Sequence, residues 1–391
     1  MTPPSDSATK PPSIWILTNG PTPNHIELFS AIAARPEVRM EVHFLRDSLV
    51  AGPDRNFNYQ ICRTWLALTS TDELRFHGRP IREAAFGQHD LYILSGLYTS
   101  VTFLASAWIL YCRGQRWAIW WERPRAKNKA HQESPVWRTL HSIKESIRRW
   151  LLMNADLVIC SGTAAVVEYQ AMGVEPDRTK MLTYCCDVSR YAAVPVESRV
   201  RVRNQLGVNN QLVFLFSGQM IPRKGVDVLI QAFTKLAEIH ADVALVLLGE
   251  GSDRLAYESM VPESLRLRIH FLGHQPQSLL PDYFAAADVF SFPSRHDGWA
   301  LVMNEACGAG LPIIATNQTG ATHDLVREGE NGFRVEADDV AGLFDAMNWC
   351  STHRDLLPEM GRRSRELVQP FSHLEGARMF TSHITTFLNS Q

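Results

Sequence analysis

Two carboxylates on either side of a tight turn are the residues of this sequence best suited to chemistry. Asp297 and Glu305 stand eight positions apart, and Gly298 follows the first of them directly. Residues 287–292 form a short apolar run that predicts a strand, and residues 299–308 predict a helix closed by glycine. A strand, a turn and a helix start leave free backbone N–H groups at the carboxyl edge of a sheet, where anions bind. The spacing therefore predicts an anion site flanked by two acids; an ordinary βα unit with two surface acids is the alternative.

A second loop supplies cations of the kind that such an anion requires. The apolar run 212–217 is followed by Gly218-Gln219-Met220-Ile221-Pro222-Arg223-Lys224-Gly225. A leaving diphosphate is stabilised by cations placed where its charge grows, with lysine acting as a point charge and arginine as a bidentate fork. Lys224 and Arg223 are therefore candidates for this role. The alternative is that a basic pair before a glycine only completes a turn.

The elements expected around these loops alternate between strands and helices. Residues 13–18 and 38–45 predict buried strands, and residues 27–34 predict a helix between them. The loop Asn19-Gly20-Pro21 ends the first strand. Strand, glycine loop, helix and strand predict a Rossmann-like domain of the α/β class. The chain contains no Gly-x-Gly-x-x-Gly, so the sequence gives a dinucleotide cofactor no direct support.

The stretch 293–312 resembles the Glu-x7-Glu signature of the retaining family-four glycosyltransferases, which have the GT-B fold. That fold consists of two Rossmann-like domains that face each other across a cleft. The family pattern is Pro-Ser-x-x-Glu-Gly-Phe-Gly-Leu-x-x-x-Glu-Ala, followed by Gly-x-Pro. The matching positions are Pro293-Ser294, Gly298, the aromatic Trp299, Leu301, Glu305-Ala306 and Gly310-Leu311-Pro312. Asp297 replaces the first Glu of the pattern, and Ala300 replaces its second Gly.

The resemblance also implies roles for individual residues. Loop 218–225 is similar to the family's Gly-Arg-Leu-x-x-x-Lys-Gly, with Gln219 in place of the arginine. By resemblance Lys224 holds the donor diphosphate, Glu305 accepts hydrogen bonds from the ribose hydroxyls, and Asp297 contacts the transferred sugar. Arg223, four residues after Gln219, offers a second cation for the diphosphate. The other positions implied at the nucleotide-sugar donor are Gly20, Gly218, Gly273, His274, Gln275, Gly298, Trp299, Ala300 and Leu301.

One carboxylate in the first half is a candidate for the acceptor side. Residues 117–121 predict a strand, and Glu122 follows at its carboxyl end, just before Arg123-Pro124. A side chain at that point faces the crevice of an α/β sheet. We therefore expect Glu122 to orient the attacking hydroxyl of the acceptor. A salt bridge from Glu122 to Arg123 or Arg125 is an equally simple explanation.

The length of 391 residues allows two or three domains. Residues 1–12 are rich in Pro, Ser and Thr and predict a disordered tail. We expect an acceptor-binding Rossmann-like domain over 13–196, with a last strand over 181–187, and a nucleotide-sugar-binding domain over 204–370. The polar residues 195–203 predict a linker between them. By resemblance, residues 371–391 form a helix that packs back on the first domain.

The composition of the sequence limits the classes of partner, cofactor and location that we expect. The formal net charge of −2 gives no overall attraction to nucleic acid. The seven cysteines include no Cys-x2-Cys pair, which favours free thiols and a cytoplasmic location. The chain has no Asp-x-Asp, so no metal ion and no cofactor are expected, and the nucleotide-sugar is a co-substrate. The longest apolar run, 101–112, is too short to span a membrane.

These observations predict a retaining, metal-independent hexosyltransferase-type enzyme that moves a sugar from a nucleotide-sugar to the hydroxyl of a sugar or lipid-linked acceptor, in polysaccharide or glycoconjugate assembly. A non-catalytic GT-B-like scaffold and a nucleotide-sugar epimerase are the alternatives, which the departures at Gln219 and Asp297 permit. Residues 123–149 hold eight Lys or Arg and two acids. Because residues 137–153 also have helical apolar spacing, they predict peripheral contact with an anionic membrane; a helix that covers a sheet is the alternative.

Overall fold

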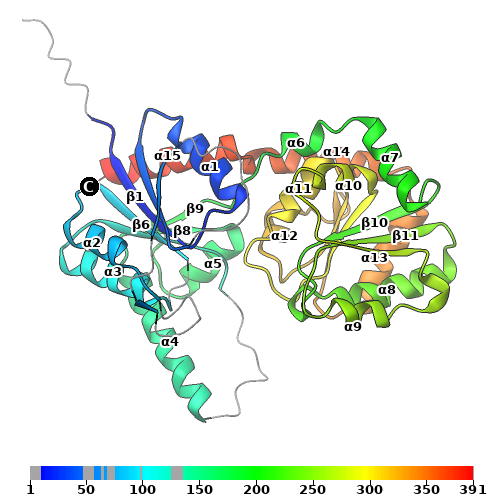
Figure 1. The fold of residues 1–391 in the computed structure, drawn as a ribbon, viewed down its shortest axis with the longest axis horizontal. Helices are drawn as coiled ribbons and strands as arrows, with labels where there is room; N and C mark the ends of the chain where they lie inside the picture. The colour runs from blue at the N-terminus through cyan, green and yellow to red at the C-terminus, as the bar shows by residue number, and fades with distance from the viewer. Residues whose placement is uncertain are drawn as a thin grey trace, which may run out of the picture.

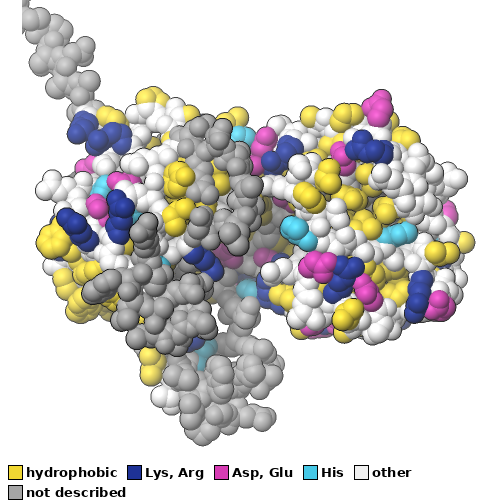
Figure 2. Space-filling view, in the orientation of Figure 1, with side chains coloured by type: hydrophobic (Ala, Val, Ile, Leu, Met, Phe, Trp, Pro, Cys, Tyr) yellow, Lys and Arg dark blue, Asp and Glu magenta, His cyan; other side chains and the backbone are white. Residues whose placement is uncertain are grey.

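The computed structural model describes residues 10–46, 57–62, 66–67, 75–96, 99–124 and 135–390. It shows two α/β domains side by side (Figure 1). Residues 1–9 of the expected tail lie outside the described residues. On the face drawn in Figure 2, acidic and basic side chains of the C-terminal domain are interspersed, so no single-sign stripe crosses that face.

The N-terminal domain is built on a seven-stranded parallel sheet in the order β3-β2-β1-β6-β7-β8-β9. Alternate residues of β1 pack into cores on opposite faces, with Ile14 and Ile16 on one side and Trp15 and Leu17 on the other. Strands β1, β6, β7 and β8 are almost entirely apolar because helices cover both faces of the sheet, whereas β2, β3 and β9 toward its edges also carry polar residues. The strands are β1 (Ser13–Thr18), β2 (Arg39–Phe44), β3 (Asn58–Ile61), β6 (Leu91–Ser95), β7 (Trp117–Trp121), β8 (Leu157–Cys160) and β9 (Thr179–Met181).

Helices connect these strands, and a short antiparallel ribbon lies outside the sheet. Helix α1 starts with Pro23 in its first turn, a position that needs no N–H donor. The helices are α1 (Pro23–Ala33), α2 (Gly78–Phe86), α3 (Val101–Cys112), α4 (Pro135–Asn154), α5 (Thr163–Ala171) and the 3-10 turn η3 (Pro176–Arg178), and the ribbon is β4 (Leu66–Ala67) with β5 (Arg75–Phe76).

The C-terminal domain repeats this plan with a six-stranded parallel sheet in the order β12-β11-β10-β13-β14-β15. Its strands are β10 (Leu212–Ser217), β11 (Val243–Leu248), β12 (Ile269–Gly273), β13 (Val289–Phe292), β14 (Ile313–Thr316) and β15 (Gly332–Val335). Its helices are η4 (Pro222–Lys224), α8 (Val226–Ile239), α9 (Arg254–Ser259), η5 (Glu263–Leu265), α10 (Leu280–Ala286), α11 (Val302–Ala309), α12 (Gly320–Leu325), α13 (Val340–Thr352), α14 (Leu357–Val368) and η6 (Gln369–Phe371).

The connection between the domains is more ordered than its composition suggests. The expected last strand over 181–187 is β9, which ends at Met181, and the chain then runs to α6 (Ser189–Ala192). Residues 195–203, expected as a polar linker, lie in α7 (Val196–Leu206), which packs against α10. This helix forms because Arg199 and Arg203 donate to the last carbonyls of α10, a tertiary contact that composition does not reveal.

The last helix, α15 (His373–Asn389), leaves the C-terminal domain and packs along α1 (Figure 1). Its N-cap is Ser372, whose hydroxyl accepts a hydrogen bond from the backbone N–H of Glu375. Phe380 and Ile384 of α15 are fully buried in a core of the N-terminal domain. The helix thus ties the two domains together.

Each sheet reverses its strand order at one point. In the N-terminal sheet the reversal lies between β1 and β6, and in the C-terminal sheet it lies between β10 and β13. In open α/β sheets, ligands bind outside the carboxyl ends of the strands at such points. The loops that follow β1, β6, β10 and β13 therefore define the region where a site is expected, and the loop after β7 lies beside them.

Candidate active site

The two loops at the C-terminal switch point are tightly joined. A Cβ atom on Gly225 would lie 2.1 Å from the carbonyl oxygen of Pro293, and Gly225 has a φ of +68°. Only glycine combines this conformation with so close an approach. The hydroxyl of Ser294 donates to the carbonyl of Arg223 at 3.1 Å, and the N–H of Arg295 donates to the same oxygen at 2.8 Å. These contacts fix the cations of one loop against the acid of the other.

Lys224, Arg223 and Asp297 form one charge cluster at this junction. The Lys224 ammonium contacts Asp297 Oδ2, and the Arg223 guanidinium lies 3.2 Å from the same oxygen. Arg223 also donates to the carbonyl of His296 at 2.7 Å. The side chains of Lys224 and Asp297 are only 12% and 13% exposed. Two cations thus face one anion, which leaves a net charge of +1 available to an anionic ligand.

Helix α11 starts later than the sequence predicts, at Val302 in place of residue 299. Ala300 has a φ of +72°, a left-handed conformation that no helix continues through. Within the described part of the chain, the backbone N–H groups of Gly298, Trp299 and Ala300 have no backbone acceptor. These groups precede the positive end of α11, so the turn remains suited to an anion.

Glu122 reaches this cluster from the other domain. It follows β7, and a Cβ atom on Gly298 would lie 2.1 Å from Glu122 Oε2. Surrounding protein raises the pKa of Glu122 to about 7, and the carboxylate of Asp297 adds to the rise, while Arg223 and Lys224 oppose it. Arg123 pairs with Glu168 at 2.6 Å, so it is not the partner of Glu122. Arg125, the other proposed partner, lies outside the described residues.

Glu305 lies in α11 beside the connection between the domains. Burial raises the pKa of Glu305 to about 7; Tyr191 and Arg190 of α6 oppose this rise, and Glu27 of α1 adds to it. Arg190 pairs with Glu27 at 3.0 Å, and Glu27 accepts a hydrogen bond from the N–H of Asp187 at 2.8 Å. The predicted ribose carboxylate thus adjoins a network that spans both domains.

Sequence reasoning missed the other members of this network: Glu27, Arg190 and Tyr191. They come from segments far apart in the chain, and none is part of a spaced motif. The guanidinium of Arg190 lies 5.5 Å from the ring centre of Tyr191, within range of a cation–π contact. Their shared location depends on the tertiary fold and leaves no local signal in the sequence.

The first loop of the N-terminal domain is also compact. The backbone carbonyl of Gly20 is 3.1 Å from Nδ1 of His25, and burial lowers the pKa of that histidine. A Cβ atom on Gly96, whose φ is +119°, would lie 2.5 Å from the side-chain oxygen of Asn19. The loop after β6 therefore packs against the loop after β1, as expected at a switch point. His25 was not predicted from the sequence.

The remaining donor candidates lie along the carboxyl edge of the C-terminal sheet. A Cβ atom on Gly249 would lie 1.9 Å from the carbonyl oxygen of Gly218. Gly273 has a φ of +71°, and its carbonyl accepts from the N–H of Gly249 at 2.8 Å. His274 is exposed, and the Gln275 amide donates to the carbonyl of Leu272 at 2.6 Å. These residues lie at the carboxyl edge of the sheet, where a nucleotide is expected to bind, on the side of β10 away from β13.

The position of the Trp299 side chain does not agree with its predicted role in donor binding. It is 0% exposed, its indole N–H donates to Asn304 at 3.0 Å, and its ring packs on Phe371. A Cβ atom on Gly162 of the N-terminal domain would lie 2.5 Å from the Trp299 ring. The ring therefore packs between domains, and only the backbone of Trp299 faces the anion turn.

Further contacts join the domains next to the cluster. Asp324 of α12 accepts from the backbone N–H of Thr163 at 3.0 Å and also contacts the Thr163 hydroxyl. Asp324 thereby caps α5, which has no side-chain cap of its own. Arg123 donates to the carbonyl of Asn317 at 3.1 Å. Helices α5 and α12 meet at this junction (Figure 1).

Helix α4 covers the basic segment expected to contact a membrane. It projects from the N-terminal domain (Figure 1), and Ile143, Lys144 and Arg149 are exposed. The side chains of Trp137, Arg138 and Leu140, and residues 125–134, lie outside the described set. No helix in the described ranges has the length and apolarity needed to cross a bilayer. Those ranges also hold no group of three or more His, Cys, Asp or Glu side chains arranged as metal ligands.

Comparisons with known proteins agree with this architecture. Residues 198–367 match the family model described as Glycosyl transferases group 1. A GDP-mannose-dependent alpha-(1-6)-phosphatidylinositol monomannoside mannosyltransferase of Mycobacterium tuberculosis is 30% identical over 53% of this chain and 52% of its own. A D-inositol 3-phosphate glycosyltransferase of Nocardia farcinica is 26% identical over 83% of this chain and 72% of its own. The chain spans about half the length of the mycobacterial relatives it matches.

The solved structures extend the likeness to the whole chain. The structure of HepE from Anabaena in complex with UDP matches 96% of this chain and 100% of its own, with a TM-score of 0.74 at 20% identity. A sucrose-phosphate synthase from Thermosynechococcus elongatus matches 97% of this chain with a TM-score of 0.75 at 18% identity. Residues 198–367 are therefore a glycosyl transferases group 1 domain, and the chain as a whole has the GT-B fold of glycosyltransferases.

Proposed function

We propose that this protein transfers a sugar from a nucleotide-sugar donor to an acceptor hydroxyl, with retained anomeric configuration and without a metal ion. The observation that carries the proposal is the cluster of Lys224, Arg223 and Asp297 at the C-terminal switch point, with Glu122 facing it from the other domain. The Glu-x7-Glu resemblance supports retention. The absence of Asp-x-Asp from the sequence supports metal independence, with Lys224 and Arg223 supplying the positive charge.

The proposed mechanism relies on positioning and electrostatics. Lys224, Arg223 and the free N–H groups of 298–300 stabilise the negative charge that grows on the leaving diphosphate. Asp297 then leaves Lys224 and contacts the transferred sugar, and Glu305 accepts hydrogen bonds from the ribose. Glu122 accepts a hydrogen bond from the attacking hydroxyl, and its ionised form is the stronger acceptor. Contact between the domains around Trp299 and Asp324 limits water at the reacting carbon.

The donor and acceptor are proposed as classes. The mycobacterial relative uses GDP-mannose by its name, and HepE holds UDP in its structure. A purine and a pyrimidine donor are both represented among the similar proteins, and both carry the diphosphate that Lys224 and Arg223 suit. A sugar or lipid-linked acceptor, in polysaccharide or glycoconjugate assembly, fits the same resemblance.

The test is release of nucleoside diphosphate from a panel of UDP-, GDP- and ADP-sugars in EDTA, with and without candidate acceptors. A glycosyltransferase releases diphosphate in an acceptor-dependent way and yields a product with retained configuration by NMR. An epimerase yields a changed sugar with no acceptor attached, and a scaffold binds without turnover. Either of these results, or complete loss of transfer in EDTA with recovery on adding a divalent cation, would contradict the proposal.

We also propose that the protein works in the cytoplasm at the surface of an anionic membrane. Lys144 and Arg149 of α4 are exposed, and Trp150 of the same helix lies 5.6 Å from Trp108 of α3, which is 57% exposed. Aromatic rings and cations together suit the interface of an anionic bilayer, where each cation contributes about 1 kcal/mol. Arg148 pairs with Glu145, so it is less available for lipid.

Flotation with liposomes tests this second proposal. The protein should float with anionic vesicles at low salt, and the double variant Lys144→Glu, Arg149→Glu should not. A matched control, Arg362→Glu with Arg363→Glu on α14, changes charge by the same amount on the other domain and should float like the wild type. Equal loss in both variants, or no flotation of the wild type, would indicate a soluble acceptor.

A further inference from the structure

A cavity of about 520 Å³ lies behind the candidate active site, at the opposite edge of the C-terminal sheet. Leu212, Asp288 and Pro312 line it, and these residues stand at the amino ends of β10, β13 and β14. The donor loops follow the carboxyl ends of β10 and β13, so the cavity and the donor site are separate. Its size is within the range of about 300–1,000 Å³ that small-molecule sites occupy.

The cavity is strongly cationic. Four arginines line it, whereas Asp288 is the one acid among its described lining residues, so the formal charge is four minus one, or +3. This excess attracts anions into a concave site, where the surrounding protein concentrates the field. The four are Arg199, Arg203, Arg354 and Arg365.

Three of these arginines have structural partners. Arg199 and Arg203 hold Asp288 at 2.6 and 3.1 Å, and both donate to carbonyls at the end of α10. Arg354 pairs with Asp242 at 2.8 Å, outside the cavity lining. Their charges still contribute to the field, but most of their hydrogen-bond donors are in use.

Arg365 is different. One of its terminal nitrogens donates to the carbonyl of Ala309 at 2.8 Å, and a Cβ atom on Gly310 would lie 2.5 Å from its guanidinium carbon. The guanidinium is thus held against the backbone at the end of α11. Among the described residues, no carboxylate pairs with Arg365 and no acceptor meets its other N–H groups. Arg365 is an exposed residue whose guanidinium is fixed on one side and keeps its other N–H donors available to a ligand in the cavity.

Gln211 is a second lining residue with an unpaired polar atom. The side-chain oxygen of Gln211 is buried and makes no hydrogen bond within the described structure. A buried acceptor without a partner is costly, and rotation of the Gln211 side chain toward the cavity would allow a ligand donor to satisfy it. A ligand that serves both residues carries oxyanions for Arg365 and a hydroxyl for Gln211.

We propose that this cavity binds a small polyanion that carries a hydroxyl group, of the hydroxycarboxylate or sugar-phosphate class, with its oxyanion on Arg365 and its hydroxyl on Gln211. Hydroxycarboxylates and sugar phosphates both carry the oxyanion and the hydroxyl group that the cavity is proposed to bind. The site lies at the opposite edge of the sheet from the proposed donor loops, although Tyr191 both lines the cavity and adjoins Glu305, and its test does not require turnover.

Calorimetric titration at low salt with citrate tests the proposal, and tricarballylate, which is citrate without its hydroxyl, is the matched ligand. Citrate should bind, and tricarballylate should bind more weakly because Gln211 stays unpaired. Arg365→Ser should raise the citrate Kd about tenfold or more, because it removes a charge-assisted hydrogen bond. Sugar phosphates, tested next, show which source binds more tightly.

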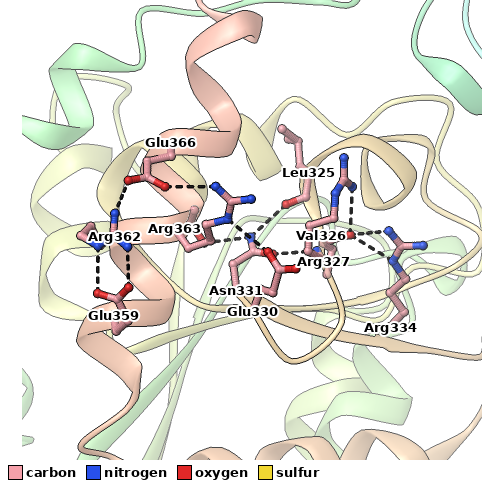
Figure 3. Close-up of polar contacts among 11 residues, drawn as sticks. Leu325, Val326, Arg327, Glu330, Asn331, Arg334, Glu359, Arg362, Arg363 and Glu366 are labelled. Atoms are coloured by element: carbon pink, nitrogen blue, oxygen red, sulfur yellow. Dashed lines mark hydrogen bonds and ion pairs between the residues drawn. The ribbon is translucent and has the colours of Figure 1, made fainter.

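Two control variants locate the binding. Arg362→Ser removes a cation from the same helix, but Arg362 pairs with Glu359 and Glu366 away from the cavity (Figure 3), so citrate should bind as in wild type. Lys224→Ala alters only the donor site and should also leave citrate binding unchanged. If Arg365→Ser does not fold by circular dichroism, Arg365→Lys keeps the charge without the fork and should weaken binding by less.

Three results would overturn the proposal. They are Kd values above about 1 mM at low salt for both citrate and the sugar phosphates, an unchanged Kd when Arg365 is replaced, and a loss of citrate binding in Lys224→Ala. The last result would place the anion at the donor diphosphate site.

Discussion

Replacing Lys224 by alanine should weaken nucleotide binding without unfolding the protein. The Lys224 ammonium contacts the carboxylate of Asp297, and both side chains are nearly buried. Arg223 remains 3.2 Å from Asp297 and is also anchored by the carbonyl of His296. The carboxylate of Asp297 is therefore not left without a partner in Lys224→Ala, and we expect the variant to fold.

The magnitude follows from the charges of the cluster. Lys224 contributes one charge-assisted hydrogen bond to the diphosphate, which is worth about 1.5–3 kcal/mol, or about 10- to 150-fold in Kd. In the variant the net charge of Lys224, Arg223 and Asp297 falls from +1 to 0. Asp297→Asn raises the same sum from +1 to +2 and frees both cations. It should therefore tighten binding of free nucleoside diphosphate several-fold while it lowers transfer.

The assay is calorimetric titration of the free nucleoside diphosphate of the donor that the panel identifies, together with kcat and KM for transfer. Lys235→Ala on α8, an exposed lysine of the same domain, is the control and should bind as the wild type does. The reasoning fails if Lys224→Ala binds the diphosphate as tightly as the wild type. It also fails if Asp297→Asn weakens binding to the same extent as Lys224→Ala.

Three further predictions concern the turn, the carboxyls and the domain junction. Ala300→Gly should stabilise the protein by about 0.5–1 kcal/mol in denaturant unfolding, because relief of a left-handed alanine exceeds the added chain entropy; a loss of stability would refute the strain. The kcat/KM, which reports the free enzyme, should rise with pH through about 7 as Glu122 and Glu305 ionise, and Glu122→Gln should make that rise shallower; a flat profile in the wild type would contradict this. Asp324→Ala removes the cap on Thr163 and should increase the radius of gyration in X-ray scattering, whereas Asp324→Asn, which keeps an acceptor, should change it less.

The sequence was sufficient to predict the fold and the family to which residues 198–367 belong. Each strand that flanks the site is an apolar run that ends in a loop containing Gly, Pro or a charged residue, and the run of motif matches from 293 to 312 lies in one βα unit. Glu122 was predicted at the crevice from its place after β7 alone, and the structure brings it against Gly298. Parallel sheets with buried strands allow this because their loops meet at a common edge.

Features that depend on tertiary contact were not predictable. The start of α11 was placed too early because the left-handed conformation of Ala300 is unusual for an alanine. Helix α7 was expected as a linker because its docking on α10 depends on Arg199 and Arg203, which look like surface charges in the sequence. Trp299 matches a family position, yet its ring packs against Gly162 from a distant segment.

The central claim is that a donor diphosphate binds between the loops that follow β10 and β13. The most direct test is a crystal structure with the nucleoside diphosphate bound. We predict that Lys224 leaves Asp297 and lies about 2.7–2.9 Å from a diphosphate oxygen. Glu305 should accept hydrogen bonds from the ribose hydroxyls. A diphosphate bound away from this junction, with the contact between Lys224 and Asp297 intact, would contradict it.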